Sequence, residues 1–150
     1  MAFNLSQRSF QRLVGVHPKL TETVRLAINY TDTDFGVIYG VRDLETQEKL
    51  FKSGKSQTMK SKHLTGDAVD LMAYVDGKAS WELNLYDDLA DAMKWAATEE
   101  GVVIRWGAAW HIDDISTWDG TMEEAMMAYI DLRRSQGRRP FIDGPHFELN

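Results

Sequence analysis

The sequence contains no cysteine in 150 residues. This absence excludes disulfide bonds, thiolate-bound zinc and cysteine nucleophiles, so any metal site must use histidine, aspartate or glutamate side chains. Long apolar runs are also missing: the N-terminal segment MAFNLSQRSFQRLVGVHP soon becomes polar, and no segment approaches the ~20 apolar residues of a membrane span. We therefore expect a protein made in the cytosol, with no signal peptide and no membrane anchor.

Clustered positive charge is lacking as well. The chain has 17 Lys and Arg against 23 Asp and Glu, a net charge of −6. The one basic cluster is Arg133, Arg134, Arg138 and Arg139, which we interpret as the solvated end of a helix, where basic residues complement the helix dipole. A nucleic-acid-binding face needs a larger concentration of basic residues, so we expect no nucleic-acid partner.

What is present is the composition of an ordinary globular protein, with 43% hydrophobic and 27% charged residues. A chain of this length can bury a core without disulfides, and we expect a single domain spanning residues 1–150. Helical patterns cover residues 6–13, 18–29, 43–54, 86–101 and 121–136, and strand patterns cover 34–42, 67–74, 78–81, 102–106 and 146–149. Asp76-Gly77 marks a hairpin turn. Mixed helices and short strands without regular βαβ units predict an α+β fold with a largely antiparallel sheet.

Strand parity places several polar residues on one side of that sheet. In the strand near residue 70, Asp70 faces away from Val69, and in the last strand His146 and Glu148 face away from Phe147. His63, just before the first of these strands, can fold onto the same face. From spacing alone, ordinary interpretations remain favoured: an aspartate at a strand edge or bonded to backbone, and partly exposed histidines.

Two imidazoles and one carboxylate on a common face would fit a catalytic zinc site, which has three protein ligands and a fourth position for water. Asp143 precedes His146 by three positions, across the turn residues Gly144 and Pro145. Its carboxylate can be aimed at the attacking water, whose proton it can take and pass to a leaving amine. The pattern therefore also supplies a candidate general base.

Two motifs connect these residues to a known family. SKHLTGDAVDL (61–71) fits SxHxxGxAxD, and FIDGPHFEL (141–149) contains DxxH. Together with a strand ending at Arg42, they make the chain resemble the D-Ala-D-Ala metallopeptidases, and within them the phage endolysins that are L-alanyl-D-glutamate endopeptidases, relatives of VanY-type carboxypeptidases. The resemblance implies a hedgehog/DD-peptidase-like fold, with a small antiparallel sheet flanked by helices and a zinc site on its open face.

The resemblance also implies roles for individual residues. His63, Asp70 and His146 are the expected zinc ligands, and Asp143 is the expected general base. Arg42 resembles the arginine that binds a substrate carboxylate or stabilises the developing oxyanion, a task suited to its fixed fork of donors.

Two further positions, Gln47 and Ser61, resemble substrate-binding residues. For Gln47 an exposed polar helix residue is an equal alternative, and for Ser61 a hydrogen bond within the loop competes. The sequence departs from the family pattern at Ala108 and Ala109, where relatives commonly carry an aspartate, which puts any carboxylate role there in doubt. The segment 111–138 is longer than in compact relatives. Its residues His111, Asp113 and Asp114 could indicate a second metal site, but a solvated loop is the favoured interpretation. The helix expected in this segment could form one wall of the substrate cleft.

These expectations predict a zinc-dependent endolysin that cleaves the L-Ala–D-Glu amide of peptidoglycan stem peptides and lyses the host cell. We expect a monomer without a separate wall-binding domain, held in the host cytoplasm until a membrane-permeabilising protein lets it reach the wall. One alternative is a D,D-carboxypeptidase or D-Ala-D-Ala dipeptidase acting on the same substrate. Another is a non-catalytic zinc-holding binding domain, which the presence of Asp143 disfavours.

Overall fold

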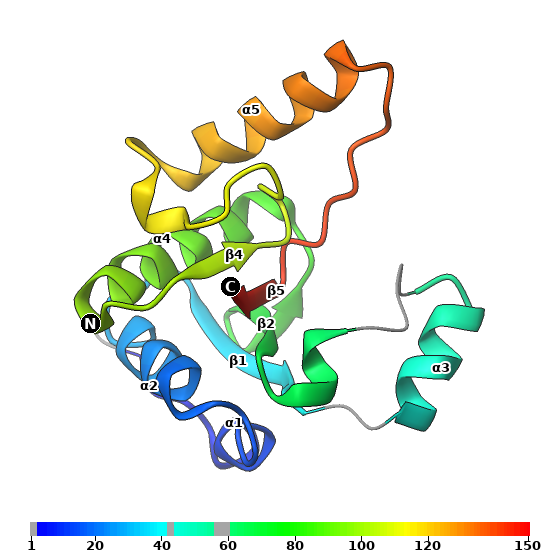
Figure 1. Cartoon of the computed structure of the whole chain (residues 1–150). Helices are drawn as coiled ribbons and strands as arrows, with labels where there is room; N and C mark the ends of the chain where they lie inside the picture. The colour runs from blue at the N-terminus through cyan, green and yellow to red at the C-terminus, as the bar shows by residue number, and fades with distance from the viewer. Residues whose placement is uncertain (1–2, 42–43, 56–60) are drawn as a thin grey trace.

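The computed structural model describes residues 3–41, 44–55 and 61–150 (Figure 1). Its helices are α1 (Gln7–Arg12), α2 (Pro18–Ala27), α3 (Leu44–Lys52), α4 (Leu83–Glu100) and α5 (Met122–Ser135), with the short 3-10 helices η1 (Lys62–Thr65) and η2 (Ile115–Thr117). Its strands are β1 (Asp34–Tyr39), β2 (Ala68–Val75), β3 (Lys78–Ser80), β4 (Ile104–Trp106) and β5 (His146–Leu149). Each α-helix and strand expected from the sequence is present, with ends that differ by a few residues.

The strands form one sheet in the order β1-β2-β5-β4, and β3 also pairs with β2. Every pairing is antiparallel, which confirms the expected fold class. β3 returns from β2 through Asp76 and Gly77, whose φ angles of 51° and 77° suit a tight hairpin turn. The first half of β2 pairs with β5, in a register that sets Asp70 opposite His146.

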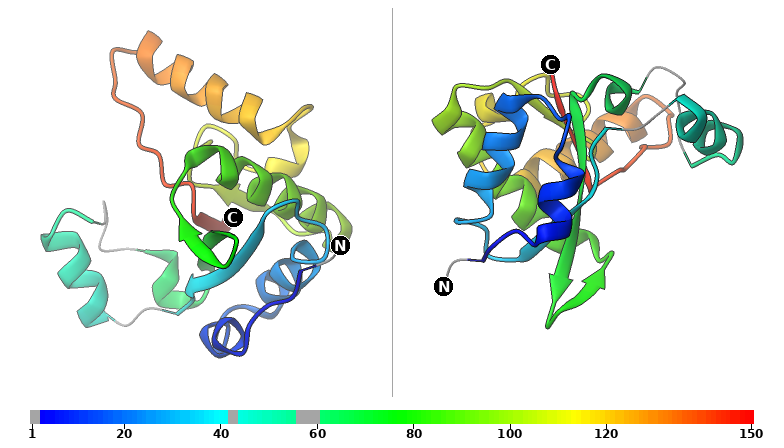
Figure 2. Two further views of the ribbon diagram at one scale, coloured as in Figure 1. Left: turned by 180° about the vertical axis from the view of Figure 1, so that it is seen from behind. Right: turned by 90° about the horizontal axis from the view of Figure 1, so that it is seen from below.

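The core lies on one face of the sheet, where β2 and β5 contribute Val69, Leu71 and Phe147. α2 and α4 supply the matching apolar stripes, represented by Leu20 and Leu89, all fully buried. Figure 2 shows these two helices side by side along the sheet, whereas α3 stands apart at the end near η1. The parity expected from the sequence is therefore correct: the large apolar side chains of β2 and β5 are buried, and their polar residues face the other side.

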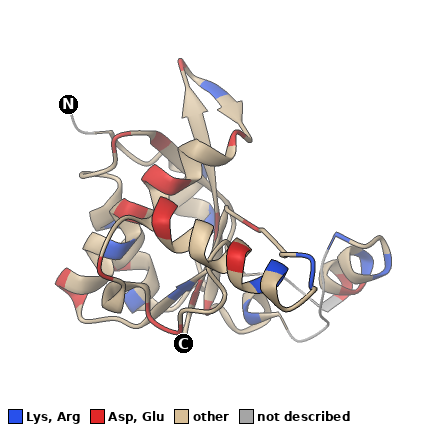
Figure 3. Cartoon of the chain, turned by 90° about the horizontal axis from the view of Figure 1, so that it is seen from above, with Lys and Arg blue, Asp and Glu red and all other residues tan. Residues whose placement is uncertain are grey.

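Within the described residues, every helix is too short or too polar to cross a lipid bilayer. Figure 3 shows the basic positions dispersed, apart from a group near the end of α5, with acidic positions on the neighbouring helices α4 and α5. The grouping at the end of α5 matches the expected basic helix end, since Arg133 and Arg134 lie in its last turn.

One carboxyl group of α4 is buried unfavourably. Asp87 is only 6% exposed, and its Oδ1 has no hydrogen-bond partner among the described residues. Burial, together with the nearby negative charges of Glu123, Asp91 and Asp88, raises the pKa of Asp87 to about 7. Ionisation of this group therefore opposes folding at neutral pH.

We expect Asp87→Asn to stabilise the protein by about 1–2 kcal/mol at pH 8. Each unit by which folding raises the pKa costs the ionised parent about 1.4 kcal/mol, and screening by solvent reduces this cost. Because the folded pKa lies above the ordinary value of 3.8, the parent loses stability as the pH rises from about 4 to about 7. The gain from the substitution should thus vanish near pH 4. Urea denaturation at pH 8 and near pH 4 measures the free energy of unfolding of both proteins. The control Asp131→Asn, on the exposed side of α5, should leave this free energy unchanged at both pH values.

Candidate metal centre and active site

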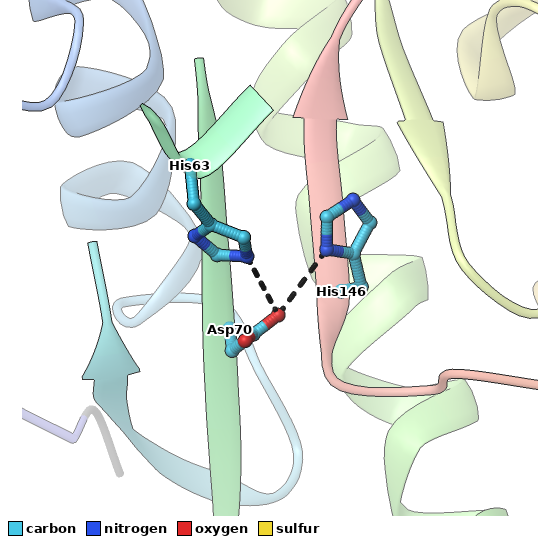
Figure 4. Close-up of side chains that lie close together, drawn as sticks. All are labelled: His63, Asp70 and His146. Carbon is cyan, nitrogen blue, oxygen red and sulfur yellow. Dashed lines mark hydrogen bonds and ion pairs between the residues drawn. The ribbon is translucent and has the colours of Figure 1, made fainter. Parts of the chain in front are cut away.

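Three elements bring the predicted ligands together (Figure 4). His63 lies in η1, Asp70 in β2 and His146 in β5. The Ser61 side chain begins η1 by accepting a hydrogen bond from the His63 N–H at 3.2 Å, and Gly66, with φ +80°, ends it and turns the chain toward β2. The pairing of β2 with β5 then sets Asp70 beside His146, 76 positions later in the chain.

The three side chains converge on one point. Asp70 Oδ1 is 3.3 Å from His63 Nε2 and 3.3 Å from His146 Nδ1. One ligand atom from each residue lies within 4.8 Å of the others, and this is the only such group of histidine and acidic residues in the described part of the chain. Both imidazoles are buried, with His63 1% and His146 8% exposed, so the ligand set is preformed and largely shielded from solvent.

The surroundings of His63 indicate which nitrogen can bind a metal. Its Nδ1 is 2.8 Å from the Gly40 carbonyl oxygen, and because a carbonyl only accepts, Nδ1 carries the hydrogen. Nε2 then presents its lone pair toward Asp70, and it is buried without a hydrogen-bond partner. An unpartnered nitrogen facing a carboxylate oxygen fits a cation held between them, and a donor set of two imidazoles and one carboxylate suits zinc.

The charges of the centre are strongly coupled. Burial by itself would raise the pKa of Asp70, but the adjacent His146 and His63, in their protonated forms, outweigh it and hold that pKa well below its usual range when no metal is bound. Burial likewise opposes the charge on His146, yet Asp70 and Glu148 together raise the pKa of its imidazole to about 9. The centre is therefore a negative pocket that stabilises positive charge.

Asp143 reaches the same place through a tight turn. The His146 N–H donates to the Asp143 carbonyl at 3.1 Å, and Gly107 bonds to both residues through its own N–H and carbonyl, each at 2.8 Å. The Trp106 indole donates to the Gly144 carbonyl at 2.7 Å, which fixes the turn against β4. The negative charge of Asp143 also contributes to the raised pKa of His146, so its carboxylate is near enough to act on that imidazole.

Comparison with known proteins identifies the family. The model of the phage L-alanyl-D-glutamate peptidase family matches residues 1–150. The chain belongs to this family. The L-alanyl-D-glutamate peptidase of Escherichia phage T5 is 32% identical over 131 residues, which is 80% of this chain and 96% of that protein. The crystal structure of the L-Ala D-Glu endopeptidase ChiX of Serratia marcescens is similar with a TM-score of 0.74 and 34% identity, covering 100% of this chain and 90% of that one.

Gly107 is a residue of this peptidase that tolerates no side chain. A Cβ added there would lie 2.2 Å from the Asp143 carbonyl oxygen and 3.0 Å from the His146 Cβ. We expect Gly107→Ala to cost about 1–3 kcal/mol of stability and to weaken zinc binding, because the turn that carries the base and a ligand must move. Denaturation and chelator competition measure the two effects. Gly54→Ala has open space around the new Cβ, although its φ of +79° adds backbone strain, and it should leave zinc binding unchanged.

The predicted substrate residues have different surroundings. Gln47 is fully buried on α3, so its interpretation as an exposed helix residue is wrong. Ser61 makes the hydrogen bond within its loop that competed with a substrate role. Arg42 lies outside the described residues, as does Asp43, the first residue of the expected helix 43–54. The substrate roles of Arg42, Gln47 and Ser61 remain predictions.

The segment after β4 contributes no ligand to the metal group. His111 packs its ring against Tyr129 at 5.7 Å, and the Asp114 side chain caps η2 by accepting from the Ser116 N–H at 3.0 Å. Ala108 and Ala109 are both fully buried. Both belong to the hydrophobic core, where an alanine side chain needs no polar partner.

Sequence reasoning placed Glu148 on the same face as His146 but gave it no role in the centre. Glu148 Oε1 lies 2.8 Å from His146 Nε2, on the side of the imidazole away from Asp70. Burial would raise the pKa of Glu148, but its bond to His146, with the charges of that residue and of Lys62, lowers it overall. The available signal was parity, because Glu148 follows His146 by two positions in a strand and must share its face.

Proposed function

We propose that this peptidase is a zinc-dependent endolysin that hydrolyses the amide between L-alanine and D-glutamate in peptidoglycan stem peptides. The convergence of His63, Asp70 and His146 beside Asp143 is the observation that supports it most directly. The phage and Serratia relatives are named for action on this bond. Two buried histidines and an aspartate would hold the ion, consistent with their donor types.

When bound, zinc would polarise the scissile carbonyl and make water a better nucleophile by lowering its pKa toward ~7. Asp143 accepts the proton as the water oxygen joins the carbonyl carbon. It then gives this proton to the amine nitrogen of D-glutamate as the amide bond breaks, which leaves a carboxylic acid on L-alanine that ionises by losing the second proton of the water to solvent. Arg42 would neutralise the negative charge that develops on the carbonyl oxygen, while Gln47 and Ser61 would orient the peptide.

The biological setting is part of the proposal. The chain would act as a monomer, with residues 1–150 forming one catalytic domain. It would be held in the host cytoplasm until lysis and then reach the wall. The family match over residues 1–150 supports the single catalytic domain, and the phage T5 relative supports the link to phage lysis.

Mass spectrometry of digested peptidoglycan tests the proposal. The zinc-loaded protein should release fragments with a new N-terminal D-glutamate, and a chelator should abolish their release until zinc is restored. Release of free D-alanine or of D-Ala-D-Ala instead would assign a carboxypeptidase or dipeptidase. Zinc binding without any cleavage would assign the non-catalytic binding domain.

A further inference from the structure

The imidazole of His146 lies between two carboxylates. Nδ1 is 3.3 Å from Asp70 Oδ1, within the metal-ligand group, and Nε2 is 2.8 Å from Glu148 Oε1. Both the imidazole and the Glu148 side chain are about nine-tenths buried, with 10% exposed in each case. Because an ionised carboxylate only accepts hydrogen bonds, Nε2 must carry the hydrogen in this contact.

Glu148 is itself held in place by two cations. Its second oxygen, Oε2, lies 3.4 Å from Lys62 Nζ and 4.0 Å from Arg105 Nη1. Lys62 precedes His63 in η1, and its ammonium also donates to the Leu149 carbonyl. Each oxygen of Glu148 therefore has its own partner, one toward the imidazole and one toward the basic side chains.

Arg105 is fixed in turn by Trp110. One Arg105 nitrogen donates to the Trp110 carbonyl at 2.7 Å, and the guanidinium carbon lies 5.2 Å from the centre of the indole ring. The same indole lies 5.5 Å from the imidazole of His146. The ring of His146 is thus held by a carboxylate at one edge and an aromatic neighbour beside it.

We propose that Glu148 is a positioning residue, which keeps the hydrogen of His146 on Nε2 and leaves Nδ1 as the ligand atom. The two histidines then present opposite nitrogens to the centre, since the Gly40 carbonyl keeps the hydrogen of His63 on Nδ1 and leaves Nε2. A carboxylate that accepts the remote N–H of a metal-bound imidazole fixes both tautomer and ring orientation. The inference rests on the zinc site of the proposed function and not on the bond cleaved.

The alternative is a purely structural tie, in which Glu148 only connects β5 to the basic residues of η1 and β4. Such a tie would affect the stability of the fold without affecting how well the folded centre binds zinc. Zinc affinity and the tautomer of His146 therefore distinguish the two, and neither depends on cleavage of peptidoglycan.

The test compares the parent with Glu148→Gln, which keeps the shape, and Glu148→Ala. Chelator competition with zinc should show affinity weakened about 10-fold in the first and up to about 100-fold in the second, the range known for outer partners of metal ligands. Long-range ¹H–¹⁵N spectra of the zinc-loaded proteins should show a protected Nε2–H of His146 in the parent. In Glu148→Ala this hydrogen should exchange rapidly with solvent. Glu99→Gln, near the end of α4, should match the parent in both measurements.

Affinity within twofold of the parent for both variants, with an unchanged Nε2–H signal, would overturn the proposal and leave the structural tie. If Glu148→Ala fails to fold, the isosteric Glu148→Gln decides the question alone. A parent protein that binds zinc but cleaves no peptidoglycan would refute the proposed function, while the role of Glu148 would still be decided by the affinities.

Discussion

Asp143→Asn is expected to reduce kcat/KM for peptidoglycan cleavage by about 10²–10⁴, the usual contribution of a general base, while the zinc content stays that of the parent. Asparagine has the same shape but cannot accept the proton of the attacking water. The hydrogen bonds that hold the turn to Gly107 and His146 come from the main chain, so the substitution should leave the metal centre in place. Release of N-terminal D-glutamate, measured beside bound zinc, reports both properties.

Asp113→Asn is the matched control, because Asp113 is exposed and takes no part in the metal group. It should cleave like the parent. If Asp143→Asn keeps its zinc and cleaves at more than half the parental rate, another group must accept the proton and the assignment of Asp143 is wrong. If it loses zinc together with activity, Asp143 contributes to metal binding and not only to proton transfer.

Local patterns predicted the strands that carry the centre. β2 and β5 alternate apolar and polar residues, so the faces of Asp70 and His146 followed from parity alone. Asp76-Gly77 predicted the β2–β3 hairpin because both residues adopt positive φ readily. These predictions succeeded because each depends only on neighbours in the chain.

The surroundings of the histidines were beyond local patterns. The alternation of residues predicts which side of the sheet a side chain faces, but not which strands are neighbours. The local pattern therefore did not predict that β2 pairs with β5, and the family motifs connected the residues of the two strands. No helix or strand pattern in the sequence covers residues 62–65, whereas they form η1 with His63 inside it. Gln47 shows the same limit, since a helical pattern does not reveal which polar residue the fold buries.

Asp70→Asn should weaken zinc binding more than about 100-fold, beyond the range for outer partners of a ligand, because Asp70 is the only carboxylate in the ligand group. A neutral amide provides no charge to offset the cation, and its NH₂ group competes for the space beside the imidazoles. Zinc at a thousand times the parental Kd stabilises the folded parent by about 4 kcal/mol, whereas a site weakened about 100-fold keeps at most about 1.4 kcal/mol of this. Added zinc should therefore raise the melting temperature of the parent much more than that of Asp70→Asn.

Asp67→Asn provides the comparison for Asp70, because it lies in the same motif but its carboxylate accepts from the Thr65 hydroxyl at 2.8 Å, outside the ligand group. It should keep the zinc-dependent increase in melting temperature. Since Asp70 Oδ1 is the atom that both imidazoles share at 3.3 Å, its replacement disturbs both other ligands at once. An Asp70→Asn protein that binds zinc as tightly as the parent would show that the three side chains are not the metal ligands, and the peptidase mechanism would then need a different centre.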